Sequence, residues 1–110
     1  MQNEVKYTLD GLFFTWDDRK AAKNWQKHRI DFRLAAEVFL DECAIDVADR
    51  LHDTAEPRRQ VIGETVSRQN TLFVVYVERE SWDGTDVFRL ISARNANKKE
   101  RKIYEQNLSR

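Results

Sequence analysis

The chain of 110 residues has the length of one domain, so we expect a single domain over residues 1–110. Hydrophobic residues make up 41% of it and can supply a core, while 3 glycines and 1 proline exclude a collagen-like or Pro/Gly-rich disordered chain. The 19 basic and 19 acidic side chains cancel, so net charge alone points to no nucleic-acid partner.

The charges are nevertheless segregated along the chain. Residues 16–29 hold five Lys or Arg against two Asp, and residues 89–110 hold seven against two Glu. Between these basic segments, residues 31–56 carry eight Asp or Glu against two Arg. Such segregation allows a local anion-binding site on a protein that is neutral overall.

Other classes of protein lack their usual sequence signals. The chain has one cysteine, Cys43, and no segment that resembles a signal peptide, so we expect a cytoplasmic protein. Its longest apolar run, residues 72–77, is far shorter than the roughly 20 residues of a membrane-spanning helix, so we expect no membrane partner. A glycine-rich phosphate loop, a paired-cysteine motif and a nucleophile elbow are missing, so we expect no cofactor and no metal site.

The first half of the chain predicts two helices. Residues 1–12 are expected to form an N-terminal arm or an edge strand, and residues 13–15 a short strand. Asp17 can cap a helix that extends to about Lys27, and Asp31 can cap a second one. The second helix has apolar residues at the spacing of one buried stripe, namely Phe32, Ala35, Ala36 and Phe39.

The second half predicts strands followed by a helix. Content of β-branched and aromatic residues indicates strands near residues 44–48, 60–66, 72–78 and 85–92, and their short connections favour antiparallel pairing. Asn97 and Glu100 have the spacing of a capping box, which predicts a final helix. The expected fold is therefore α+β, with two N-terminal helices, an antiparallel sheet of 3–4 strands and a C-terminal helix.

Several basic side chains are candidates for binding an anion. Arg89 lies in an apolar strand and faces opposite to Phe88 and Leu90. A salt bridge at the sheet edge explains it as readily as a phosphate site, for which the guanidinium fork is suited. His28, at the end of the first helix, has the pKa of a general acid or base, although a capping role is more common for a single histidine.

An ordered set of residues resembles the BrnT family of bacterial toxins over about residues 13–105. Its most specific parts are Trp16-Asp17, Lys27-His28, and the string from Ile91 to Arg94 that leads into a charged helix. The remaining members of the set are Phe14, Thr15, Lys20, Asn24, Phe32, Ala36, Val38, Phe39, Asp41, Glu56, Arg58, Ile62, Gly63, Arg89, Leu90, Ala96, Glu100 and Tyr104.

The resemblance implies a RelE-like fold and a metal-independent endoribonuclease that cleaves RNA, such as mRNA free or on the ribosome, and thereby inhibits translation. It also implies neutralisation by a cognate BrnA-type antitoxin, with operator DNA bound only through that antitoxin. The alternative is a catalytically weak or silent antitoxin-binding module that acts mainly in operator autorepression.

The implied reaction is attack of an RNA 2′-hydroxyl on the adjacent phosphate, which needs a base, an acid and cations. The candidate catalytic residues are His28, Glu56, Arg58, Arg89 and Arg94, with the arginines stabilising charge and Glu56 or His28 as base. His28 or Tyr104 is the candidate acid. The candidate RNA-binding residues are Lys20, Lys27 and Tyr104, where the lysines would contact phosphates in a salt-dependent way.

Two features depart from the family pattern. Arg29 stands where the family usually has glycine, directly after the Lys-His pair, and this implies a conformational cost at the helix end. Residues 79–85 make a longer turn than is typical of the family.

Overall fold

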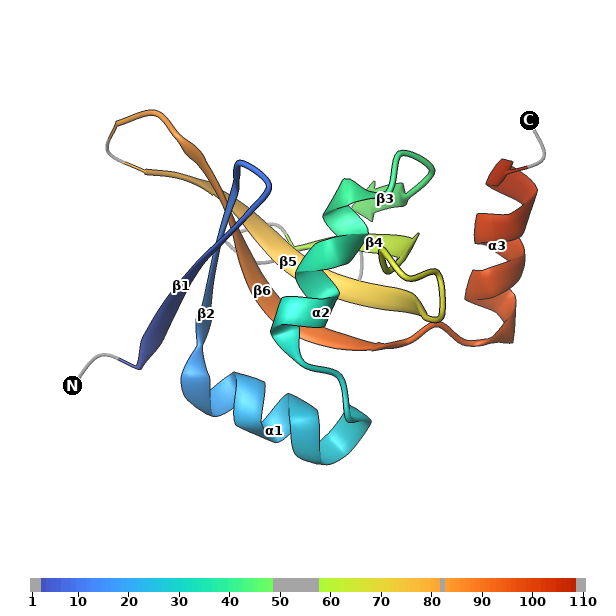
Figure 1. Ribbon diagram of the computed structural model, residues 1–110, viewed down its shortest axis with the longest axis horizontal. Coiled ribbons are helices and arrows are strands. Elements are labelled where there is room, and N and C mark those ends of the chain that lie inside the picture. The colour runs from blue at the N-terminus through green and yellow to red at the C-terminus, as the bar shows by residue number, and fades with distance from the viewer. Residues whose placement is uncertain (1–2, 49–57, 82, 109–110) are drawn as a thin grey trace.

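A computed structural model describes residues 3–48, 58–81 and 83–108. The chain begins with a β-hairpin that turns at Asp10 and Gly11, both of which have positive φ. Helices follow, then four strands and a last helix (Figure 1). The elements are β1 (Glu4–Leu9), β2 (Leu12–Asp17), α1 (Asp18–His28), α2 (Phe32–Ala36), the 3-10 helix η1 (Glu37–Leu40), β3 (Ile45–Ala48), β4 (Arg59–Glu64), β5 (Thr71–Glu80), β6 (Asp86–Asn95) and α3 (Lys98–Leu108).

The strands form one six-stranded mixed sheet in the order β1-β2-β6-β5-β4-β3. All neighbours are antiparallel except β2 and β6, which run parallel and place Thr15 opposite Arg89. In Figure 1, α1 and α2 lie on one side of the sheet, and α3 follows β6 at the far end. The first and last thirds of the chain therefore meet in the middle of the sheet.

The predicted fold was wrong in its sheet and in its N-terminal part. The sheet has six strands and is mixed, not antiparallel with three or four strands, and a β-hairpin precedes the helices. The second expected helix is a five-residue α2 that continues as η1. Strand β1 was hard to recognise because it alternates polar residues with Val5, Tyr7 and Leu9, which pack on the core only partly buried.

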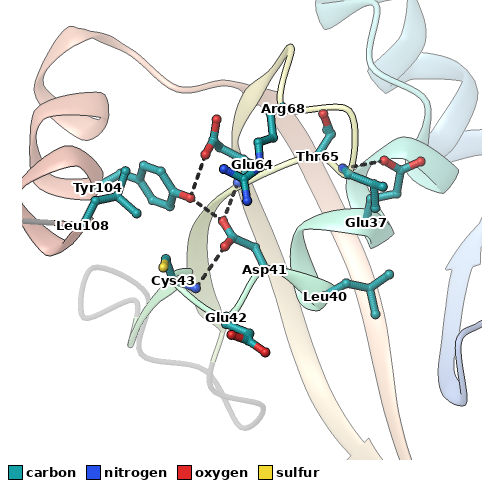
Figure 2. Close-up of a pocket in the computed structure, with 11 residues that line it drawn as sticks. Glu37, Leu40, Asp41, Glu42, Cys43, Glu64, Thr65, Arg68, Tyr104 and Leu108 are labelled. Atoms are coloured by element: carbon teal, nitrogen blue, oxygen red, sulfur yellow. Dashed lines mark hydrogen bonds between the residues drawn. The ribbon is translucent and has the colours of Figure 1, made fainter.

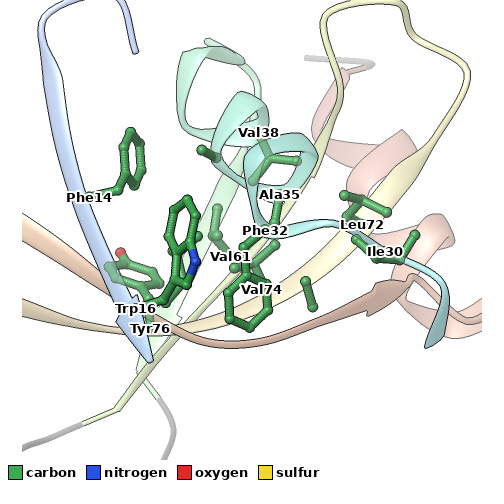
Figure 3. Close-up of a cluster of buried hydrophobic side chains, with 13 residues drawn as sticks. Phe14, Trp16, Ile30, Phe32, Ala35, Val38, Val61, Leu72, Val74 and Tyr76 are labelled. Carbon is green, nitrogen blue, oxygen red and sulfur yellow. The ribbon is translucent and has the colours of Figure 1, made fainter. Parts of the chain in front are cut away.

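The main core lies between the sheet and the α2–η1 segment. Side chains of β2 point toward those of α2 and of the central strands (Figure 3). Gly63 allows η1 to approach β4 closely, because a Cβ atom there would lie 3.2 Å from the Cβ atoms of both Val38 and Ala44. Buried members of this core include Phe14, Trp16, Phe32, Val38, Leu72, Val74, Tyr76 and Leu90.

The predicted helix starts are confirmed. Asp17 Oδ1 accepts a hydrogen bond from the Arg19 N–H at 2.8 Å, and Asp31 Oδ1 accepts one from the Arg33 N–H at 2.8 Å. At the other end of α1, Arg29 has φ 58° and ψ 31°, and its N–H donates to the Trp25 carbonyl at 2.9 Å. Arg29 thus ends α1 in the left-handed conformation that glycine adopts without strain, at a cost of about 1 kcal/mol.

A buried asparagine joins α1 to the sheet. Asn24 Nδ2 donates to the carbonyls of Ala93 at 2.9 Å and Ile30 at 3.0 Å, and its Oδ1 accepts from the Ala93 N–H at 3.0 Å. Strand β2 pairs with β6 only as far as Arg89, so Ala93 has no strand neighbour on that side. The Asn24 side chain takes the place of the missing strand.

We predict that Asn24→Ala lowers the free energy of unfolding by about 3 kcal/mol, because it leaves three buried backbone groups without partners. Gln26→Ala, at an exposed position of the same helix, is the matched control. Urea denaturation followed by circular dichroism measures both. A loss within about 0.5 kcal/mol of the control would show that Asn24 is no structural clamp.

Candidate functional site

The face of the sheet opposite α1 and α2 is called the rear face and carries Thr15, Val77, Arg89 and Arg94. On β6, Phe88 packs against the core, so the next side chain, Arg89, points to the other face. Thr15 and Val77 pair with Arg89 in the register of the neighbouring strands and therefore share its face. The strand pattern thus confirms that Arg89 faces away from the main core.

Arg89 interacts with the N-terminal hairpin. Its Nη1 lies 3.5 Å from the Thr15 hydroxyl and forms an ion pair with the Glu4 carboxylate on the edge strand β1. The arginine side chain is 19% exposed, and that of Glu4 is 40% exposed. The salt bridge considered from the sequence is therefore present, and it lies on a surface that a larger anion can reach.

Arg58 lies at the end of β4 that is nearest to the Arg89 segment of β6. It directly precedes β4 and is half-buried. The first residue of β4, Arg59, pairs with Tyr76 on β5, and the next residue of β5, Val77, pairs with Arg89. Strands β4 and β6 are two strand spacings apart, which is about 10 Å. The backbone of Arg58 therefore lies roughly that far from the Arg89 segment.

A second cationic side chain, Arg94, lies near the end of β6 and contacts the first turn of α3. Its guanidinium lies 4.3 Å from the centre of the Phe73 ring and makes two bonds to the Glu100 carboxylate, at 2.8 and 3.0 Å. Asn97 and Glu100 form the predicted capping box, with reciprocal bonds of 2.9 and 2.8 Å. Burial acts to raise the pKa of Glu100, but bonds from Arg94 and the Asn97 N–H lower it below its ordinary value.

His28 is electrostatically coupled to Arg94. It is half-buried at the last turn of α1, and burial lowers its pKa below the ordinary 6.5, with Lys27 and Arg94 adding to the shift. The Asn24 clamp on Ala93 fixes this placement, because His28 follows Asn24 by one helical turn and Arg94 follows Ala93 directly. A neutral imidazole beside a guanidinium can accept a proton near neutral pH.

Two of the remaining candidate residues lie on α1. Lys20 and Lys27 are exposed there, and Glu56 lies outside the described residues. Glu4 has no predicted role in the sequence, and Glu100 was expected as a helix cap and as part of the family resemblance. The capping-box spacing was the available signal for Glu100, whereas nothing local indicated that Glu4 would bind Arg89.

Tyr104 lies in a pocket between η1, β4 and α3, with a volume of about 380 Å³ (Figure 2). Its hydroxyl donates to Asp41 Oδ2 at 2.6 Å and lies 3.1 Å from Glu64 Oε1. The residue is 3% exposed, which leaves little surface for RNA. Burial and the two carboxylates raise its pKa, so the hydroxyl keeps its proton at neutral pH.

The Asp41 carboxylate anchors this pocket. Burial acts to raise its pKa, but hydrogen bonds from the Glu64 N–H, the Tyr104 hydroxyl and the Cys43 N–H bring it below the ordinary 3.8. Glu37 similarly accepts a bond from the Val66 N–H at 3.0 Å. The pocket is acidic and would repel phosphate. Its carboxylates instead hold α3 in place through the Tyr104 hydroxyl.

We predict that Tyr104→Phe raises the pKa of Asp41 and lowers the free energy of unfolding at pH 7 by about 2 kcal/mol. A lowered carboxyl pKa stabilises the fold above its unfolded value of about 3.9, and this contribution is lost as the pH falls through the folded value. The difference from the wild type should therefore be largest above about pH 5 and shrink in stronger acid. Urea denaturation across pH measures it, with Tyr7→Phe as control; a pH-independent loss would contradict it.

Within the described residues, no group of three or more His, Cys, Asp or Glu side chains is placed to hold a metal ion. No helix in the described part of the chain is long and apolar enough to cross a membrane.

The structure thus places two arginines on one face of the sheet and a histidine of lowered pKa on the neighbouring helix α1, and such groups can act on a phosphate. Residues 16–100 match the family described as the ribonuclease toxin BrnT of type II toxin-antitoxin systems. The chain therefore belongs to the BrnT family, as the sequence resemblance indicated: it is a ribonuclease toxin, with RNA as substrate and an antitoxin as partner. No curated protein matches the chain.

Proposed function

We propose that the chain is a metal-independent endoribonuclease that cleaves RNA on the rear face of its sheet, inhibits translation, and is neutralised by a BrnA-type antitoxin. The observation that supports the proposal is that Arg58 directly precedes β4, while Arg89 and Arg94 of β6 share this face. Strand β6 separates the latter two by roughly 15 Å, so they bind different phosphates of the same RNA strand.

The chemistry fits the Arg94 end of the face, because the Asn24 bonds to Ala93 bring the end of α1 to this part of β6 and the Arg94 charge helps to lower the pKa of His28. His28 takes the proton of the RNA 2′-hydroxyl, whose oxygen attacks the adjacent phosphorus. The bond from phosphorus to the 5′-oxygen breaks, and the 5′-oxygen takes a proton from water. Arg94 stabilises the charge that develops on the phosphate. Arg58 and Arg89 hold a neighbouring phosphate, and Lys20 and Lys27 extend the basic surface along α1. Glu56 is the alternative base.

One observation favours the alternative of a weak or silent antitoxin-binding module. Arg89 and Arg94 each carry a carboxylate partner from the chain itself, Glu4 and Glu100, which a phosphate must displace or share. Expression of the chain alone separates the two functions. An endoribonuclease arrests bacterial growth and cleaves RNA, whereas a silent module at the same soluble level does neither.

We predict that His28→Gln lowers kcat for RNA cleavage by about 10²- to 10⁴-fold, the usual effect of losing a general base. Because burial and the neighbouring cations lower the pKa of His28, wild-type kcat/KM should rise with pH through a value below 6.5 and then level off. Initial rates on an RNA oligonucleotide between about pH 4 and pH 8 measure this. An unchanged rate in His28→Gln, with a limb near the ordinary pKa of a glutamate, would assign the base to Glu56.

We predict that Arg89→Ala raises KM about tenfold with little change in kcat, and reduces the slope of log affinity against log salt by about one. Arg33→Ala, an exposed arginine of α2 that pairs with Asp31, is the matched control. Cleavage rates at several salt concentrations measure both variants. If Arg89→Ala and Arg33→Ala behave alike, the rear face does not bind the RNA.

A further inference from the structure

We propose that a groove beside Arg89 binds one nucleobase of the RNA, stacked on the ring of Phe13. The groove has a volume of about 490 Å³. It lies between the β1–β2 hairpin and the tip of the β5–β6 hairpin, and we call it the hairpin groove. Its lining residues are Glu4, Lys6, Tyr7, Thr8, Phe13, Phe14, Thr15, Arg79, Glu80, Ser81, Asp83, Thr85 and Val87.

The strand register places the hairpin groove on the rear face. Phe13 pairs with Thr8 on β1 and with Val87 on β6, and Val87 pairs with Arg79 on β5. Phe13 is followed two residues later by Thr15, which pairs with Arg89, so both rows of side chains point to the same face. The Phe13 side chain in the groove therefore lies one pair of side chains along the sheet from Arg89.

Phe13 is unusual for a phenylalanine in this fold. Its side chain is 43% exposed, whereas its neighbour Phe14 is 1% exposed in the core. Phe14 contacts three other aromatic rings, while no ring contact of Phe13 occurs among the described residues. An exposed ring without a partner, at the floor of a groove, offers one free π-face.

The walls of the groove suit a neutral heterocycle better than a second phosphate. The lining holds three acidic residues, Glu4, Glu80 and Asp83, and two basic ones, Lys6 and Arg79, so the groove has no excess of positive charge. Asp83 is further satisfied by the Ser81 hydroxyl and by the Thr85 N–H at 3.0 Å. Hydroxyl groups around the ring can bond the edge of a base, as single-stranded RNA is commonly read on aromatic side chains.

Residues 79–81, 83 and 85, in the turn that is longer than is typical of the family, line the hairpin groove. Strands β5 and β6 continue their pairing to Glu80 and Asp86, beyond the last pair of β6 with β2. The ends of β5 and β6 lie next to the β1–β2 hairpin (Figure 1), and one side of the groove is lined by Arg79, Glu80, Ser81, Asp83 and Thr85. These residues therefore add a wall to the proposed RNA surface.

The inference rests on the proposed function, since a base can occupy the groove only if RNA lies on the rear face. The probe is a fluorescein-labelled 2′-O-methyl oligoribonucleotide of mixed sequence, which the enzyme cannot cleave because it lacks a free 2′-hydroxyl. Fluorescence anisotropy gives its affinity for the purified chain. A second probe of equal length carries the same backbone with abasic residues.

Phe13→Leu, which keeps an apolar side chain without a π-face, should weaken binding of the base-bearing probe about tenfold, within the roughly five- to hundredfold range for loss of one stacking contact. Phe13→Trp should bind like the wild type. Both variants should bind the abasic probe as the wild type does. Val66→Ala, at an exposed apolar residue outside the groove, is the matched control and should change nothing.

The outcomes separate the two proposals. Wild-type affinity of Phe13→Leu for the base-bearing probe, in a chain that binds and cleaves RNA, overturns the stacking site and leaves the nuclease intact. A loss of affinity for the antitoxin without a loss for RNA assigns the groove to the antitoxin instead and also overturns it. A wild-type chain that neither binds the probe nor cleaves RNA removes the proposed function, and the stacking site with it.

Discussion

The bonds between the Asn24 side chain and the Ala93 backbone determine how the two halves of the molecule fit together. Strand β2 pairs with β6 only as far as Arg89. Beyond that residue, the backbone groups on this side of β6 would have no hydrogen-bond partners unless another group replaced the strand. Asn24 provides both a donor and an acceptor at the spacing of a peptide group. The same contact sets the position of α1, and hence of His28 relative to Arg94, so a structural bond fixes the geometry of the candidate site.

The two faces of the sheet carry different kinds of side chain. The face under α1 and α2 buries aromatic rings such as Phe14 and Trp16, while the rear face carries Arg89 beside Thr15 and Arg94 over Phe73. The α3 helix covers only one end of the rear face, where Tyr104 joins it to the Asp41 and Glu64 carboxylates. The carboxylates of this pocket thus lie beside α3 and outside the part of the face that carries Arg89, for which we propose contact with RNA.

Helix caps, which depend on residues close in sequence, were predicted correctly. The pairing of strands that are far apart in sequence was not predicted. Asp17, Asp31 and the Asn97–Glu100 pair cap helices within three residues of themselves, so their roles follow from spacing alone. The parallel contact of β2 with β6 joins residues more than 70 positions apart, and no turn or periodicity encodes it. For the same reason the sequence indicated Arg89 as an anion binder but could not reveal Glu4, a partner from the opposite end of the chain.

The carboxylate partners of the arginines are compatible with binding RNA. A guanidinium has five N–H groups, and Glu100 engages one from each terminal nitrogen of Arg94, so donors remain for a phosphate. Glu100 also holds the first turn of α3 through the Asn97 N–H, which keeps the arginine in a fixed orientation against Phe73. The ion pair to Glu4 is different, because that carboxylate lies on an exposed edge strand and has no second partner among the described residues. An RNA phosphodiester carries the same single negative charge as this carboxylate and can accept the same hydrogen bonds from a guanidinium, so it can compete with Glu4 for Arg89. In the function that we propose, Arg94 is therefore a preorganised group, and Arg89 is one that exchanges its ion pair with Glu4 for RNA.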